Sequence, residues 1–161
     1  MRPLLFELQN KWNLTGVKPY SMARIEIEMT EKFVFLTELE VRMTDINPAN
    51  HVGHDAFVSL IHEARVRFLE YLDFPVPGVG EKGLIIADLA VSYKAQSFYK
   101  DRLKFKIGAG DFNKHGCDIF YRVTNMKTGA LVLLAKTGIV FFDYSKDRVT
   151  NIPEEFVSLF I

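Results

Sequence analysis

The fold is decided by residues 41–72, which read VRMTDINPANHVGHDAFVSLIHEARVRFLEYL. A polar loop rich in Asp, Asn and His leads directly into a segment with helical periodicity. Apolar residues recur in this segment at three- and four-residue spacing, which places them on one helical face. These residues are Phe57, Leu60, Ile61, Ala64 and Phe68. The spacing predicts one long helix that is buried along one side, with polar loop residues gathered at its start.

The segments on both sides of this helix are predicted to be strands. Before the loop, apolar and charged residues alternate with the two-residue period of a half-buried strand. The predicted apolar face carries Phe33, Phe35, Leu39, Val41 and Met43. After the helix, a loop rich in proline and glycine spans 75–83. Four further strand-like runs follow, at 84–93, 103–112, 117–125 and 130–142.

One long helix and about five antiparallel strands define an α+β domain, in which a curved sheet wraps around the central helix. Gly129 suits a hairpin turn that requires positive φ, and Pro153 is expected to begin a short terminal helix. The edges and second face of such a sheet need cover, so we expect a homodimer or homotetramer. We divide the chain into an extension of unassigned role at 1–28 and the domain at 29–161.

The composition is typical of a soluble globular protein, since 48% of the 161 residues are hydrophobic and 25% are charged. Lysine plus arginine total 20, as do aspartate plus glutamate, so no charge excess favours nucleic acid or an anionic membrane as a partner. We expect no membrane insertion and no signal peptide. The single cysteine, Cys117, cannot form an internal disulfide, and a cytoplasmic location is the resulting expectation.

The loop and helix also carry a family resemblance. The segment TDINPANHVGHDAF, followed by HEARVRFL, resembles SDTDAMGHVNNAVY followed by FEEARVEFL. The second pattern is usual in hotdog-fold acyl-CoA thioesterases of the 4-hydroxybenzoyl-CoA thioesterase type. The segments SYKAQSFYKDRLKFKIGAG and FFDYSKDRVTNIPEEF resemble later strands and the tail of the same family. The resemblance covers about residues 33–160 and implies the hotdog fold.

The resemblance implies hydrolysis of an acyl-CoA thioester, with coenzyme A as part of the substrate and no separate cofactor. It places the site at a subunit interface, beside the N-terminus of the central helix. Backbone N–H groups there lack intrahelical acceptors and lie at the positive end of the helix dipole, so they can stabilise an oxyanion. The substrate-binding and oxyanion candidates are Gly53, His54, Asp55 and His51.

The family's loop aspartate, which acts as base or nucleophile, is replaced here by Asn47. An amide cannot take a proton from water or form an anhydride, so Asn47 can only orient water or a carbonyl. His54 is a candidate general base, with a neutral ligand contact as the alternative. Asp45 is a second candidate base if the chain there is extended; otherwise it only caps a turn. His51 is expected to brace the loop.

Other polar residues form less specific patterns. Glu63 is expected to pair with Arg67, four residues on. A metal site built from the loop histidines lacks a third defined ligand, and we predict none. If the replacement at position 47 abolishes hydrolysis, the alternative is a non-catalytic protein that binds acyl thioesters. The candidates for contact with CoA phosphates are Lys94, Lys100, Arg102 and Lys136.

Overall fold

The computed structural model describes residues 25–74 and 82–160; residues 1–24, 75–81 and 161 lie outside the described range. Most of the extension and of the proline- and glycine-rich loop therefore lies outside it. In chain order, the elements are β1 (Phe35–Glu40), the 3-10 turn η1 (Met43–Asp45), α2 (His54–Tyr71), β2 (Lys82–Tyr93), β3 (Arg102–Gly110), β4 (Gly116–Asn125), β5 (Leu131–Asp143), β6 (Arg148–Val149) and α3 (Glu154–Val157).

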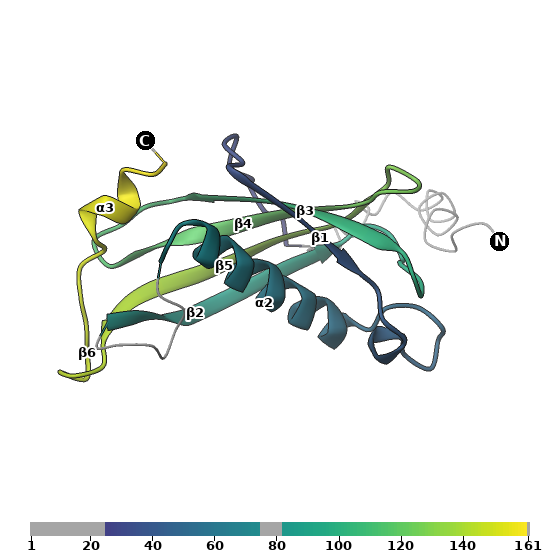
Figure 1. The fold of residues 1–161 in the computed structure, drawn as a ribbon, viewed down its shortest axis with the longest axis horizontal. Coiled ribbons are helices and arrows are strands. Elements are labelled where there is room, and N and C mark those ends of the chain that lie inside the picture. Colours follow the sequence, from purple (N-terminus) through teal and green to yellow (C-terminus); the bar gives the residue numbers. More distant parts are fainter. Residues whose placement is uncertain (1–24, 75–81, 161) are drawn as a thin grey trace, which may run out of the picture.

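The strands form one antiparallel sheet in the order β1–β3–β4–β5–β2, with β6 paired to β5. The helix α2 lies along one face of this curved sheet (Figure 1). The predicted α+β class is confirmed. The sheet has a sixth strand because the chain turns back after β5, and two residues pair with its end. The longer strand β2 and the short strand β1 occupy opposite edges.

The core lies between α2 and the sheet. The five apolar residues that were predicted to share one helical face are all buried. On strand β3, Leu103, Phe105 and Ile107 are fully buried while Lys106 is exposed. Complete burial of an apolar side chain of this size stabilises a protein by about 1.5 to 3 kcal/mol. The two apolar surfaces therefore fix the position of α2 on the sheet.

The strand predicted before the loop is too long at its C-terminal end. Leu39 and Val41 are buried as predicted, but the side chain of Met43 is 61% exposed. The strand β1 ends before this residue, and the chain then forms η1. The Arg42 N–H donates to the Asp45 carboxylate at 2.8 Å, and such a local bond favours a turn over a continued strand.

Two turn predictions are confirmed. Gly129 has a φ of 71° between β4 and β5, where the Asn125 side-chain oxygen accepts the N–H groups of Lys127 and Thr128. Pro153 stands immediately before α3, which is a single turn. Within residues 25–74 and 82–160, no helix is long and apolar enough to cross a membrane.

Candidate functional site

The loop between η1 and α2 is closed by backbone hydrogen bonds. The Asn47 N–H donates to the His51 carbonyl at 2.9 Å. The Gly53 N–H donates to the Asp45 carbonyl, also at 2.9 Å. These bonds hold the polar residues of the loop together directly before the first turn of α2.

The side chain of Asn47 is engaged within this loop. Its Oδ1 accepts the Ala49 N–H at 2.9 Å, and its Nδ2 lies 3.4 Å from His51 Nε2. His51 Nδ1 lies 3.3 Å from the Ala49 carbonyl oxygen. Because a carbonyl oxygen can only accept, this contact assigns the proton to Nδ1 and leaves Nε2 as the acceptor for Asn47. These contacts support the bracing role expected for His51.

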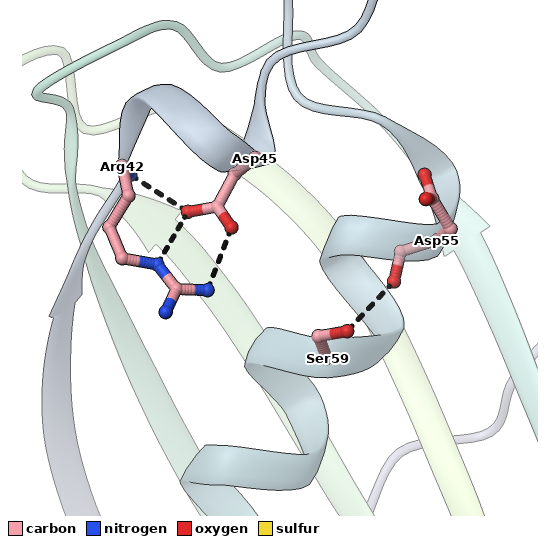
Figure 2. Close-up of polar contacts among 4 residues, drawn as sticks. All are labelled: Arg42, Asp45, Asp55 and Ser59. Carbon is pink, nitrogen blue, oxygen red and sulfur yellow. Dashed lines mark hydrogen bonds and ion pairs between the residues drawn. The ribbon is translucent and has the colours of Figure 1, made fainter.

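The carboxylate of Asp45 is buried and faces Arg42 (Figure 2). It accepts hydrogen bonds from the Arg42 backbone N–H, Nε and Nη2 at 2.8, 3.2 and 2.9 Å. Burial acts to raise the pKa of Asp45, but the bonds and charge of Arg42 outweigh it, and the pKa lies below its usual value. A base role for Asp45 required an extended chain at this point, but the chain forms the turn η1 here. Because Arg42 already donates three hydrogen bonds to this carboxylate and lowers its pKa, the alternative role is favoured, in which Asp45 caps the turn.

The first turn of α2 offers three backbone donors. The Phe57 N–H makes the first helical hydrogen bond, to the Gly53 carbonyl at 3.0 Å. The N–H groups of His54, Asp55 and Ala56 have no acceptor among the described residues. Gly53 was expected to belong to this set, but a loop carbonyl takes its N–H. Free donors at the positive end of an 18-residue helix can bind a carbonyl oxygen that gains negative charge.

The absence of a side chain at Gly53 leaves room for the Asp55 carboxylate. A Cβ atom at position 53 would lie 2.4 Å from Asp55 Oδ1 and 3.7 Å from Asn47 Cβ. The Asp55 carboxylate therefore lies against Gly53, well apart from the Asp45 carboxylate (Figure 2). His54 and Asp55 are both exposed. A carboxylate and an imidazole thus stand beside the free N–H groups of the helix.

Tyr93, at the end of β2, also reaches this site. Its hydroxyl donates to the His54 carbonyl at 3.2 Å, and its ring centroid lies 5.7 Å from that of Phe57. Burial, and then the charge of Asp55, raise the pKa of Tyr93. Tyr93 was not among the site residues predicted from the sequence. Its position at the end of a predicted strand was a signal, but the contact depends on how β2 crosses the start of α2.

The four cations expected at CoA phosphates fall into two groups. Arg102 and Lys136 each pair with a carboxylate on a neighbouring strand. Lys94 and Lys100 are exposed in the connection between β2 and β3 and make no ion pair with the described residues. This connection contacts the loop before α2, because Ser97 accepts a backbone N–H from it. Lys94 and Lys100 therefore lie in the connection that adjoins the site.

The predicted pairing of Glu63 with Arg67 is confirmed, with an O–N distance of 2.8 Å. The neighbouring His62 instead contacts Arg65. Residues 25–74 and 82–160 contain no group of three or more His, Cys, Asp or Glu side chains arranged to hold a metal ion.

Residues 41–160 match the family model described as the thioesterase-like superfamily. The chain belongs to this superfamily. No curated protein sequence matches the chain. The match begins at the last residues before η1 and runs to the end of the described structure, so the superfamily region contains the whole candidate site.

Solved thioesterase structures share the fold of this superfamily member. A 1,4-dihydroxy-2-naphthoyl-CoA thioesterase from Synechocystis superposes with a TM-score of 0.70 at 20% identity, over 77% of this chain and 93% of its own. A gentisyl-coenzyme A thioesterase gives a TM-score of 0.70 at 17% identity, over 79% and 100%. A DHNA-CoA thioesterase from Staphylococcus aureus gives 0.68 at 20%, over 77% and 84%. The curved antiparallel sheet around one long helix is the hotdog fold.

Proposed function

We propose that this superfamily member hydrolyses an acyl-CoA thioester to a free acid and coenzyme A. The observation that carries the proposal is the set of three backbone donors at the start of α2 that find no acceptor within residues 25–74 and 82–160, beside the exposed side chains of His54 and Asp55. Such a set combines a place for an oxyanion with groups that can take a proton from water.

In the proposed reaction, the thioester carbonyl oxygen accepts hydrogen bonds from the N–H groups of His54, Asp55 and Ala56. A water oxygen attacks the carbonyl carbon while the base removes a water proton, and the former carbonyl oxygen becomes negatively charged. The helix donors stabilise this charge more than they stabilise the neutral carbonyl, which lowers the barrier. The C–S bond then breaks, the C=O bond re-forms, and the base returns its proton to the departing thiolate.

We assign the base role first to Asp55 and second to His54. The Asp55 carboxylate and the Asn47 side chain both lie within 4 Å of a Cβ atom placed on Gly53, and Asn47 stands where the family resemblance places an aspartate. Asp55 therefore supplies a carboxylate close to the position from which one is missing. His54 carries the other exposed proton acceptor of this turn. Asn47 orients the water, and we assign Asp45, which is held by Arg42, to the structure of the loop.

One observation favours a second candidate, a non-catalytic protein that binds acyl thioesters. The Oδ1 atom of Asn47 accepts a backbone N–H of its own loop, so this side chain is partly committed to structure. In that case the helix donors bind the thioester carbonyl without activating water. Lys94 and Lys100 serve as contacts for CoA phosphates in both cases.

We also propose that the protein is a homodimer joined along β2. This edge strand spans 12 residues, and its outer side has no partner among the described strands. Ile85, Ile86 and Leu89 are exposed along it. Edge strands that stay single are generally short or charged. A second copy of β2 would continue the sheet and pair the free N–H and C=O groups of this edge.

The proposed hydrolysis is tested with short, long and aromatic acyl-CoA substrates, by following thiol release. We expect turnover by the wild type, and a loss of about a hundredfold or more in kcat for Asp55→Asn if Asp55 is the base. His54→Gln should likewise lower kcat if the His54 imidazole is the base. The matched control is Asp73→Asn, which removes an exposed carboxylate at the far end of α2.

The outcomes separate the candidates. Loss of turnover in His54→Gln but not in Asp55→Asn assigns the base to His54. Binding of acyl-CoA without turnover by the wild type contradicts the hydrolase proposal and favours the binding protein. Activity that appears only in Asn47→Asp leads to the same conclusion, because it restores the carboxylate that the family pattern carries.

A further inference from the structure

A buried cation without an anionic partner lies in the middle of α2. Arg65 is only 8% exposed, and no carboxylate of residues 25–74 or 82–160 forms an ion pair with it. Its Nη2 donates to His62 Nδ1 at 2.7 Å, which leaves the other guanidinium donors to be satisfied. Burial of a charge is costly unless the charge is paired or fully hydrogen-bonded.

Two buried hydroxyl groups belong to the same cluster. Tyr121 and Thr137 are fully buried, and neither hydroxyl oxygen has a hydrogen-bond partner in the part of the chain that the structure describes. They are diagonal neighbours on the sheet, since Thr137 pairs with Ile119, two residues before Tyr121. Burial raises the pKa of Tyr121, whereas the Arg65 charge and the Thr137 hydroxyl oppose that rise. The three side chains therefore present unused hydrogen-bonding groups to one another.

This cluster lies at a cleft between α2 and the sheet. The cleft has a volume of about 300 Å³, and both Arg65 and Thr137 line it, whereas Tyr121 does not. Its apolar walls include Val58 of the helix and Ile86 and Leu89 of β2. A cleft with apolar walls and a few convergent polar groups has the general character of a ligand site. Here the polar groups are one cation and hydroxyl donors, which suit an anionic oxygen group.

We infer that Arg65 and Thr137 form a carboxylate site, and that the acyl group of the substrate carries a second carboxylate at the end remote from the thioester. The inference rests on the proposed function, because it names the class of acyl group that the same site takes. The apolar walls receive the carbon chain. The free carboxylate pairs with the buried guanidinium and gives the Thr137 hydroxyl an acceptor.

The helix sets the expected length of the acyl group. The guanidinium contacts His62, so it lies one turn nearer the helix start than the backbone of Arg65. His62 follows His54 by eight residues, which corresponds to about 12 Å along the axis. An extended dicarboxylic acid of medium length spans this distance between the free N–H groups and the guanidinium. Sebacic acid is a suitable probe, and its CoA thioester is compared with decanoyl-CoA, which lacks the free carboxylate.

The test combines binding and kinetics on the full chain. Calorimetry measures the affinity for sebacate, and thiol release measures kcat/KM for sebacoyl-CoA and for decanoyl-CoA, which has no free carboxylate. We expect the wild type to bind sebacate and to have the higher kcat/KM with sebacoyl-CoA. Arg65→Gln and Thr137→Val should each lower the affinity for sebacate by about tenfold to a hundredfold. The control Arg122→Gln removes an exposed arginine of β4 and should change it by less than about twofold.

A purely structural role for the cluster makes a different prediction. The Thr137 hydroxyl has no hydrogen-bond partner among the described residues, so its removal should not lower the thermal midpoint of unfolding. A lower midpoint with unchanged sebacate binding therefore contradicts the inference. If Arg65→Gln does not fold, the nearly isosteric Thr137→Val decides.

The two proposals fail separately. Equal turnover of sebacoyl-CoA and decanoyl-CoA, without sebacate binding, overturns the carboxylate site and leaves the hydrolase proposal intact. Sebacate binding that depends on Arg65, without turnover of either thioester, retains the site and overturns the hydrolase. No binding of sebacate overturns the site whatever the kinetics show.

Discussion

At Asp45, a buried carboxylate accepts three hydrogen bonds from Arg42, and its pKa is lowered. A group with a lowered folded-state pKa adds stability above its unfolded pKa of about 3.9, and that stability is lost as pH falls through the folded value. We expect Asp45→Asn to lower the free energy of unfolding at pH 7 by about 1 to 3 kcal/mol. The difference from wild type should shrink as the pH falls below about 4.

Denaturant titration at neutral and acid pH measures both quantities for Asp45→Asn. The exposed Asp73→Asn serves as the control. A loss of stability that is the same at both pH values contradicts the assignment of Asp45 as a charged brace for the loop.

Cys117 gives a second prediction at this scale. Its side chain is buried, and burial, followed by the charge of Asp118, raises the pKa of the thiol to about 12. A thiol that stays protonated and covered is a poor nucleophile. We expect no alkylation by iodoacetamide at pH 8 in the folded protein and complete alkylation after denaturation. Mass spectrometry counts the added groups, and rapid labelling of the folded protein contradicts this prediction.

The residue scale is also where prediction from sequence reached its limit. Asn47, His51 and His54 could be singled out because their spacing matches a known pattern. The orientation of a side chain depends on contacts that spacing does not specify. The Asp55 carboxylate lies against Gly53, in space that a Cβ atom would occupy, and Tyr93 meets the helix through a strand nearly forty residues away in sequence.

The helix α2 was the most predictable element, because burial against a sheet imposes a periodicity that is legible in sequence. Ile61 is 1% exposed at the centre of its buried face. We expect Ile61→Ala to lower the free energy of unfolding by about 2 to 5 kcal/mol. The exposed Glu70→Ala on the same helix should change it by less than about 0.5 kcal/mol. Denaturant titration distinguishes the two, and equal effects would show that the helix does not pack as described.

The short elements were less predictable for a physical reason. The turn η1 replaces the end of a predicted strand because one side chain, that of Asp45, bonds to the backbone three residues before it. Such a bond is a local alternative that alternation of apolar residues does not reveal. The strand β6 forms only because two residues meet the end of β5 after the chain has turned.

At the scale of the whole molecule, we predict a homodimer, because the outer side of the edge strand β2 pairs with none of the described strands. We expect the 18.5 kDa chain to sediment as a dimer, and Ile85→Lys, on the exposed edge, to shift it toward monomer. The control is Leu36→Lys on β1, the opposite edge, where the side chain is also exposed. Analytical ultracentrifugation measures both. A wild type that remains monomeric at micromolar concentration, or equal effects of both variants, contradicts pairing along β2.

Two backbone hydrogen bonds confine the loop before α2. The Gly53 N–H donates to the Asp45 carbonyl, and the Asn47 N–H donates to the His51 carbonyl. A binding surface of this kind loses little conformational entropy on association, since its backbone is already confined. The Gly53 amide should accordingly exchange slowly with deuterium in the free protein, and ligand should slow it little further. Recognition here is then closer to a rigid encounter than to folding upon binding.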